Sequence, residues 1–353
     1  MFYVDRAKIL QYWMLLFLIA LVLLNAFFNG YRDSSSILAG VMASRAMRPR
    51  WALYLVAAAD LIAPFIFGSA VARSITTGLV NTSVITLNTI VIAMIAAVSW
   101  NLFSWWRGIP SSSTHSLIGG LVGATLITSG PHTIILNGLV FVILPLIFAP
   151  IIGLVLGFVV MNILLASFST AHPRVNTLFR RLQVVTMLTL ALSNSSNDTQ
   201  KSMGVITLGL VLAGRLPSFD IPFWVLIACS LTLALGASRG DWRQIRNLGG
   251  KIYRIRPLNA LASQTASSLL IIAASAFGMP VSTPHVVSTT LMGSGAAERI
   301  NKVRWHVASE MVTTWAVTIP ATMAISALIF ITITGVHDLG LLFNWYVPTV
   351  VSP

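Results

Sequence analysis

Two stretches of this sequence place glycine, proline, hydroxyl side chains and a histidine in the same order, about 170 residues apart. Elbow 1 spans 108–120 and begins Gly-Ile-Pro-Ser-Ser-Ser-Thr-His; elbow 2 spans 278–298 and begins Gly-Met-Pro-Val-Ser-Thr-Pro-His. A proline can occupy the first turn of a helix, which leaves the N–H groups and hydroxyls that follow at the positive end of the helix dipole. Such a helix start binds anions. Two copies therefore predict one oxyanion held between two helix ends.

Two aspartates lie in polar clusters within long apolar segments. Asp33 stands in Asn-Gly-Tyr-Arg-Asp-Ser-Ser-Ser (29–36), and Asp198 in Ser-Asn-Ser-Ser-Asn-Asp-Thr-Gln-Lys (193–201). An ionisable residue at membrane depth is costly unless it is paired or solvated, so both are site candidates. Carboxylate, amide and hydroxyl oxygens suit a hard cation or a proton. Because a carboxylate repels an anion unless a cation or proton lies between them, the pattern predicts that anion and cation bind together, as in a symporter.

The composition places both motifs in a membrane protein. The chain has 353 residues, of which 56% are hydrophobic and 9% charged. Apolar runs of roughly 20 residues recur, the length that crosses a bilayer. No cleavable signal peptide is evident, and the single Cys229 excludes a disulfide framework and a cysteine metal site. The net charge of +13 is better explained by basic loops that orient the chain than by nucleic-acid binding.

We therefore expect an all-α polytopic membrane protein with about ten crossings. They are placed at 12–44, 51–72, 84–105, 109–129, 133–161, 183–214, 222–238, 258–277, 281–298 and 307–333. The segments 12–44 and 183–214 are too long for one straight crossing, and each contains a polar cluster near its middle. Both are expected to be broken helices.

The basic residues predict an orientation. With the N-terminus outside, sixteen Lys and Arg residues fall in inside loops and four in outside segments. Inside loops carry the excess of positive charge in membrane proteins. This places both termini outside a plasma membrane and makes the basic loop 239–256 cytoplasmic.

The same topology divides the chain into two inverted repeats. Five crossings in each half turn the second half upside down relative to the first, with interrupted helices at matching positions. Such repeats are typical of secondary transporters, whose site lies at the midplane. The predicted division is a first repeat at 1–162, a cytoplasmic linker at 163–182 and a second repeat at 183–353.

Four segments carry a resemblance to a known family. They are 29–36, Trp100-Asn101-Leu102 with elbow 1, Ser196 to Gly204, and Pro280 to His285 followed by Gly293-Ser294-Gly295-Ala296-Ala297 and Val303-Arg304-Trp305. In combination they resemble the inorganic phosphate transporter (PiT) family across nearly the whole chain. The resemblance implies phosphate uptake by symport with H⁺ or Na⁺, an inverted-repeat fold and a homodimer, with no organic cofactor and no enzymatic activity.

From this resemblance, one group of side chains is expected to bind the anion and another to manage the coupling charge. The expected anion ligands are Ser111, Ser112, Ser113, Thr114, Ser282 and Thr283. The expected coupling residues are Asp33, Asp198, Asn29, Ser36, Asn197 and Lys201, with Arg32, Asp60, Gln200, His115 and His285 as secondary candidates. A coupling Na⁺ ion, if used, is expected at Asp33 and Asp198.

Four positions depart from the family pattern. Ser36 stands where Asn is usual, Arg32 where His or Asn is common, Asp60 where Asn is common, and Gln264 where Glu is frequent. Lys201 matches the branch that resembles proton-coupled members, and its ammonium could supply the charge that other members take from Na⁺. Arg32 could pair with Asp60 or Asp33, or could contact the anion.

The two elbow histidines and three tryptophans each allow more than one role. His115 and His285 could carry a proton, since imidazole titrates near neutral pH, although fixing the elbow backbone is the simpler role. Trp100, Trp105 and Trp106 are typical of interfacial anchors.

The sequence is also compatible with functions besides phosphate symport. A sulfate permease of the same fold is the main competing function. An intramembrane Ser/His hydrolase fits less well, because it needs one positioned nucleophile and base rather than two inverted copies. A passive channel is also possible.

Overall fold

The computed structural model describes residues 2–109, 111–172, 174–245 and 255–341. Within these ranges the chain is almost entirely helical, with one isolated β-bridge between Val80 and Ile134. The first half contains α1 (Phe2–Ser44), α2 (Pro49–Ile66), α3 (Ala70–Ile75), α4 (Leu87–Arg107), α5 (Ser113–Ser129), η1 (Pro131–Thr133) and α6 (Leu136–Ser167). The second half contains α7 (Val175–Leu212), α8 (Phe223–Arg239), α10 (Pro257–Ala276), α11 (Thr283–Glu298), η2 (Ile300–Lys302) and α12 (Trp305–Leu341).

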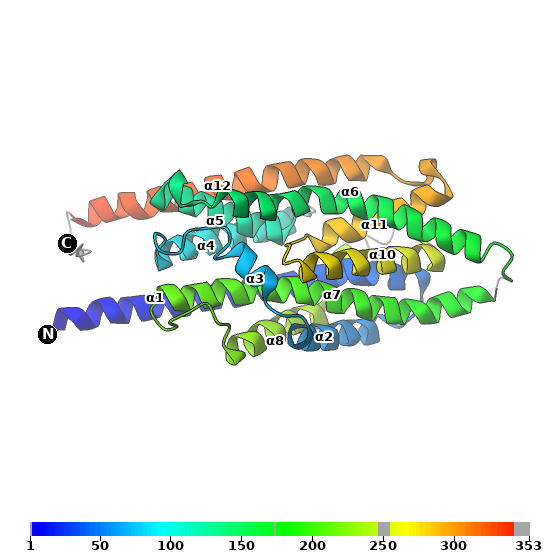
Figure 1. The fold of residues 1–353 in the computed structure, drawn as a ribbon, viewed down its shortest axis with the longest axis horizontal. Helices are drawn as coiled ribbons and strands as arrows, with labels where there is room; N and C mark the ends of the chain where they lie inside the picture. The colour runs from blue at the N-terminus through cyan, green and yellow to red at the C-terminus, as the bar shows by residue number, and fades with distance from the viewer. Residues whose placement is uncertain (1, 110, 173, 246–254, 342–353) are drawn as a thin grey trace.

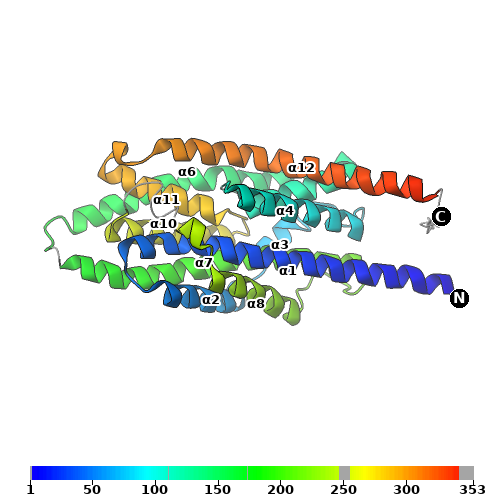
Figure 2. The same cartoon turned by 180° about the vertical axis from the view of Figure 1, so that it is seen from behind.

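The helices form an elongated bundle in which α1, α6, α7 and α12 run along the long axis (Figure 1). The start of α1 and the end of α12 lie at the same end of the molecule, and the α1–α2 and α6–α7 connections lie at the other, as the view from behind also shows (Figure 2). Both observations agree with an even number of crossings.

Six helical segments are long and apolar enough to cross a membrane: Lys8–Ser44, Pro49–Ile66, Leu87–Arg107, Leu136–Ser167, Pro257–Ala276 and Ala308–Gly335. Large apolar side chains are exposed along α6, among them Leu136, Ile147 and Ile151. Exposed apolar surface of this extent is typical of a membrane-facing helix. The expected all-α polytopic membrane fold is confirmed, while the number of ten crossings stays a prediction.

The two halves exchange contacts in matching pairs. Helix α1 packs against α8 and α2 against α7, and in the same way α6 packs against α11 and α12 against α5. Each pair joins one helix from each half. The division of the chain into repeats at 162 and 182 stays a prediction. In the structure α6 continues to Ser167 and α7 begins at Val175, so both helices extend into the predicted linker.

The expected breaks in the two longest helices do not occur. Both α1 and α7 are continuous through their polar clusters. Neither cluster contains a proline, so no backbone donor is missing, and the polar side chains bond to neighbouring helices instead. A break occurs where none was expected, within 51–72, where α2 ends at Ile66 and α3 begins at Ala70.

The two elbows have the same local geometry. Gly108 follows α4 with φ 69° and Gly278 follows α10 with φ 71°, a left-handed conformation that glycine adopts without strain. Helix α5 then begins at Ser113 and α11 at Thr283. Pro110 lies outside the described residues, and Pro280 precedes the first turn of α11, which contains Pro284 instead. Residues 246–254 of the basic loop 239–256 also lie outside the described residues.

Candidate functional site

The helix starts of the two elbows meet in the interior of the bundle. The Thr114 hydroxyl donates a hydrogen bond of 3.1 Å to the backbone carbonyl of Val281. The His115 and His285 rings lie 5.3 Å apart between centroids, and His285 in turn lies 4.2 Å from the Trp315 ring on α12. All of the elbow residues in these contacts are buried. Two helix N-termini from different halves therefore share one polar interior.

Lys201 joins the two elbows to the acidic cluster of α7. Its Nζ donates to Asp198 Oδ1 at 2.6 Å, to Thr114 Oγ1 at 2.7 Å and to the Val281 carbonyl at 3.0 Å. A lysine ammonium has three donors, so all of them are used. The side chain is only 4% exposed. This fully satisfied cation fixes the distance between α7, elbow 1 and elbow 2.

Arg32 occupies a comparable place in the first half. Its Nη2 donates to the Ser111 carbonyl at 2.8 Å. Ser111 and Val281 hold the same position in the two elbows, three residues after the glycine, so each long helix binds the equivalent elbow carbonyl through a cation. Among the described residues Arg32 makes no ion pair, so the suggested pairing with Asp33 or Asp60 is not seen.

Asp33 and Asp198 are brought close together. Their carboxyl groups interact electrostatically, and both side chains are buried. Two buried carboxyl groups that are both ionised repel each other. The pair can therefore hold a proton, or a cation, between its oxygens.

Further buried oxygens of this region have no protein partner within the described chain. They include Asp60 Oδ1, Asn194 Oδ1 and Asp198 Oδ2. Asn194 precedes Asp198 by four residues and so lies on the same face of α7. Asn194 was not predicted as a site residue from the sequence, although this spacing could have identified it. Buried oxygens without donors fit a proton or a hard cation.

Asn197, expected among the coupling residues, and Gln200, a secondary candidate, both bond to backbone groups. Asn197 donates to Ser275 Oγ and the Met279 carbonyl and accepts from the Val281 N–H, so it holds the backbone of elbow 2. Gln200 accepts from the Val71 N–H and donates to the Phe67 carbonyl, which bridges the break between α2 and α3. Ser36 is buried on α1.

The elbow hydroxyls fall into two groups. Ser111 Oγ accepts from Trp100 Nε1, Ser112 Oγ caps α5 through the His115 N–H, and Thr114 binds Lys201. The second group is buried without a partner among the described residues and consists of Ser282 Oγ and Thr283 Oγ1. This second group can bind an anion without first breaking a protein hydrogen bond.

A small cavity lies next to Lys201. Its volume is about 10 Å³, roughly the space of one water molecule, and its lining includes Asn29, Ser113, Lys201 and Ser202. Asn29 and Ser113 thus face the same space as the central ammonium, and both were expected at the site. The cavity gives Ser113 of elbow 1 a small opening beside the ammonium.

Several supporting residues were not expected at the site from the sequence. Trp100, expected as an interfacial anchor, donates to Ser111 at 2.9 Å. Asn101 donates to Asn25 and accepts from Ser116, which ties α1, α4 and α5 together. The sequence did contain a signal for this contact, because an amide within an apolar run, such as Asn25, needs a hydrogen-bond partner.

Comparison with known proteins shows the family to which this chain belongs. Residues 29–326 match the model of a family described as "Phosphate transporter family". The chain is 38% identical over 323 residues to a "Probable low-affinity inorganic phosphate transporter" of Rhizobium meliloti, covering 91% of this chain and 97% of that protein. A protein of the same description from Bacillus subtilis is 36% identical over 308 residues, covering 86% and 92%. Among solved structures, "The sodium-dependent phosphate transporter" matches with a TM-score of 0.85 at 22% identity, over 91% of this chain and 99% of that one.

Proposed function

Because this chain belongs to the phosphate transporter family, we propose that it imports inorganic phosphate by symport with a cation, through alternating access to the site between the elbows. The observation that carries the proposal is the meeting of both elbow helices with Lys201 and the Asp33–Asp198 pair. Anion-binding helix ends and titratable carboxyls then share one interior.

The buried charges explain why the two cargoes travel together. Among the buried charged residues that lie within the predicted crossings, Arg32 and Lys201 supply two positive charges, and Asp33, Asp60 and Asp198 supply three negative charges when all are ionised, a net charge of 2 − 3 = −1. A negative interior repels phosphate, and charge interactions are strong in a low-dielectric interior. Adding a proton or a cation removes this repulsion, so binding of one cargo favours binding of the other.

Lys201 favours H⁺ over Na⁺ as the coupling ion. Its ammonium already occupies the space beside Asp198 Oδ1 and uses that oxygen. The positive charge that a metal ion would bring is therefore part of the chain. What remains is the repulsion between the Asp33 and Asp198 carboxyls when both are ionised, which one proton removes.

The anion is bound by neutral groups. Ser113, Ser282, Thr283 and the N–H groups at the starts of α5 and α11 are the donors that we assign to it, with Ser111, Ser112 and Thr114 holding the elbows in shape. Neutral hydroxyls bind an anion more weakly than an arginine fork, which suits release on the far side. His115 and His285, whose rings adjoin, would separate and meet again as the halves move.

A sulfate permease is the second candidate, because buried Arg32 adds a permanent charge close to elbow 1. A hydrolase is less well supported, because His115 Nδ1 has no hydrogen-bond partner within the described chain, so this ring nitrogen is not paired with a serine hydroxyl as the base of a triad is. We also propose that the protein is a homodimer in the plasma membrane, with both termini outside.

Uptake of labelled phosphate into proteoliposomes tests the proposal, with pH and Na⁺ gradients imposed separately. We expect an inward proton gradient to drive accumulation and a Na⁺ gradient to have no effect. Excess sulfate should not compete. Accumulation driven only by Na⁺ would overturn the choice of H⁺, equilibration without accumulation would indicate a channel, and sulfate transport without phosphate transport would reject the substrate.

A further inference from the structure

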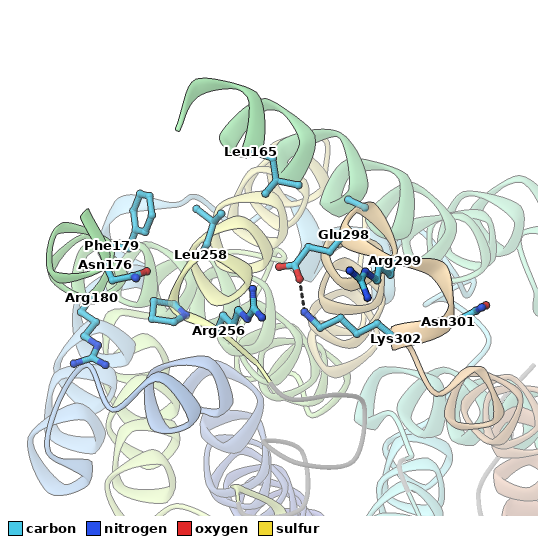
Figure 3. A pocket seen from close by; sticks show the side chains of 12 residues that line it. Leu165, Asn176, Phe179, Arg180, Arg256, Leu258, Glu298, Arg299, Asn301 and Lys302 are labelled. Atoms are coloured by element: carbon cyan, nitrogen blue, oxygen red, sulfur yellow. Dashed lines mark hydrogen bonds and ion pairs between the residues drawn. The ribbon is translucent and has the colours of Figure 1, made fainter. Parts of the chain in front are cut away.

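A large pocket lies far from the elbows, at the end of the molecule that contains the α6–α7 connection. It encloses about 1080 Å³. Its walls come from the C-terminal end of α6, the N-terminal ends of α7 and α10, the C-terminal end of α11, and η2 (Figure 3). The basic loops predict that this end faces the cytoplasm.

Positive charge dominates this pocket. Four basic residues line it, Arg180 from α7, Arg256 beside α10, and Arg299 and Lys302 around η2, against the single acid Glu298. Figure 3 shows Arg256, Arg299 and Lys302 gathered around Glu298, with Arg180 on the opposite wall. The lining therefore carries a formal charge of 4 − 1 = +3.

Glu298, the single acid of the lining, already accepts hydrogen bonds from two neighbours. Glu298 accepts from Lys302 at 2.5 Å and from Asn259 Nδ2 at 2.8 Å. Within the described part of the chain Arg180, Arg256 and Arg299 form no ion pair. Three guanidinium groups thus surround one cavity, and no carboxylate of the described residues neutralises them. Guanidinium forks match the oxygens of a phosphoryl group in pairs.

The rest of the lining is largely apolar. Leu165, Phe179 and Leu258 contribute to the same pocket, and Leu165 belongs to α6, whose apolar side chains are exposed along its length. The volume far exceeds what one orthophosphate ion needs, and an apolar wall beside a basic one fits a headgroup with its acyl chain. Basic pockets between membrane helices on the cytoplasmic side bind such headgroups.

We propose that this pocket binds a phosphoryl anion through Arg180, Arg256 and Arg299. Its size and apolar wall favour an anionic phospholipid as the source, and a free phosphate ion has the same chemistry. An occupant would connect the start of α7, the helix that carries Asp198, to the end of α11, the helix that begins at elbow 2. The site is separate from the proposed transport site and does not depend on its function.

Native mass spectrometry of the purified full-length protein tests this proposal. The probe is phosphatidylglycerol, with phosphatidylcholine as the neutral-lipid control. The triple variant Arg180→Gln/Arg256→Gln/Arg299→Gln removes the pocket charges. The matched control Arg45→Gln/Arg48→Gln/Arg50→Gln removes three charges at the same end of the molecule, outside the pocket. We expect the pocket variant to bind phosphatidylglycerol at least tenfold more weakly than the wild type, and the control variant to bind it unchanged.

Competition separates the two sources of the phosphoryl group. Displacement of the lipid by inorganic phosphate, but not by chloride at equal ionic strength, would assign the pocket to the free ion; resistance to phosphate would assign it to the lipid. Equal lipid binding by all three proteins would overturn the proposal. If the glutamine variant does not elute as a folded protein, Arg180→Lys/Arg256→Lys/Arg299→Lys replaces it, with weaker binding expected because lysine lacks the paired donors.

Discussion

The carboxyl group of Asp198 takes part in two interactions. One oxygen accepts a hydrogen bond from Lys201, and the carboxyl group also interacts electrostatically with the carboxyl of Asp33. Asparagine retains an oxygen that can accept from Lys201, but it cannot exchange a proton. We therefore expect Asp198→Asn to fold and to bind phosphate, while gradient-driven accumulation in proteoliposomes is lost and phosphate exchange continues.

The control for this substitution is Asp220→Asn, since the Asp220 side chain is 78% exposed in a loop. It should accumulate phosphate like the wild type. Normal proton-driven accumulation by Asp198→Asn would remove Asp198 from the coupling step.

The elbow hydroxyls give a second prediction, in which affinity and stability separate. Ser282 Oγ is buried without a partner among the described residues, so Ser282→Ala should raise the KM for phosphate several-fold and leave the melting temperature unchanged or slightly higher. Ser112 Oγ caps α5, so Ser112→Ala should lower stability by about 1 kcal/mol and affect KM less. Uptake kinetics and thermal unfolding of both variants measure this; the opposite pattern would exchange the roles of the two serines.

Residue types at the site could be predicted from the sequence, but their partners could not. The repeated motifs indicated Asp33, Asp198 and the elbow hydroxyls. Which hydroxyls are engaged depends on Trp100, Lys201 and the Val281 carbonyl, whose neighbours come from distant segments. Asn197, expected at the coupling site, and Gln200, a secondary candidate, both bond to backbone groups. From sequence alone, an amide that binds an ion cannot be distinguished from one that binds backbone.

At the level of the elements, a close approach between α1 and α8 places Asp33. A Cβ on Gly30 would lie 2.0 Å from the Leu233 carbonyl oxygen, closer than atoms can pack. Gly30→Ala should therefore push the two helices apart and shift Asp33 away from Asp198, lowering both the melting temperature and the transport rate.

Gly335→Ala is the matched helical control, because a Cβ there meets nothing within 4 Å. Alanine favours a helix over glycine by up to about 1 kcal/mol, so this variant should be neutral or more stable. A Gly30→Ala protein as stable and active as the wild type would show that α1 can move without affecting the site.

Most helix boundaries were predictable to within a few residues, although α7 begins eight residues earlier and α6 ends six residues later than expected. Helix continuity was not predictable. The lengths of 12–44 and 183–214 suggested breaks at their polar clusters, yet α1 and α7 accommodate Ser34, Ser35 and Ser196 within a regular helix through side-chain bonds. The actual break at Phe67–Ser69 is bridged from α7 by Gln200. Sequence patterns reveal polar residues in a helix, but they do not show whether those side chains bond to carbonyls of their own helix, as Ser34 and Ser196 do, or of another segment, as Ser35 does.

For the whole molecule, the remaining prediction concerns orientation. The inside loops would hold sixteen of the Lys and Arg residues and the outside segments four, and this asymmetry sets the topology of membrane proteins.

Thr170 lies in the α6–α7 connection and Ser218 in the α7–α8 connection, at opposite ends of α7, and both are exposed. The native Cys229 is buried, so it should not react with a membrane-impermeant maleimide and provides the background control. We expect Ser218→Cys to be labelled in intact cells and Thr170→Cys only after permeabilisation. The reverse result would show that the molecule has the opposite orientation and that the basic pocket faces the outside of the cell.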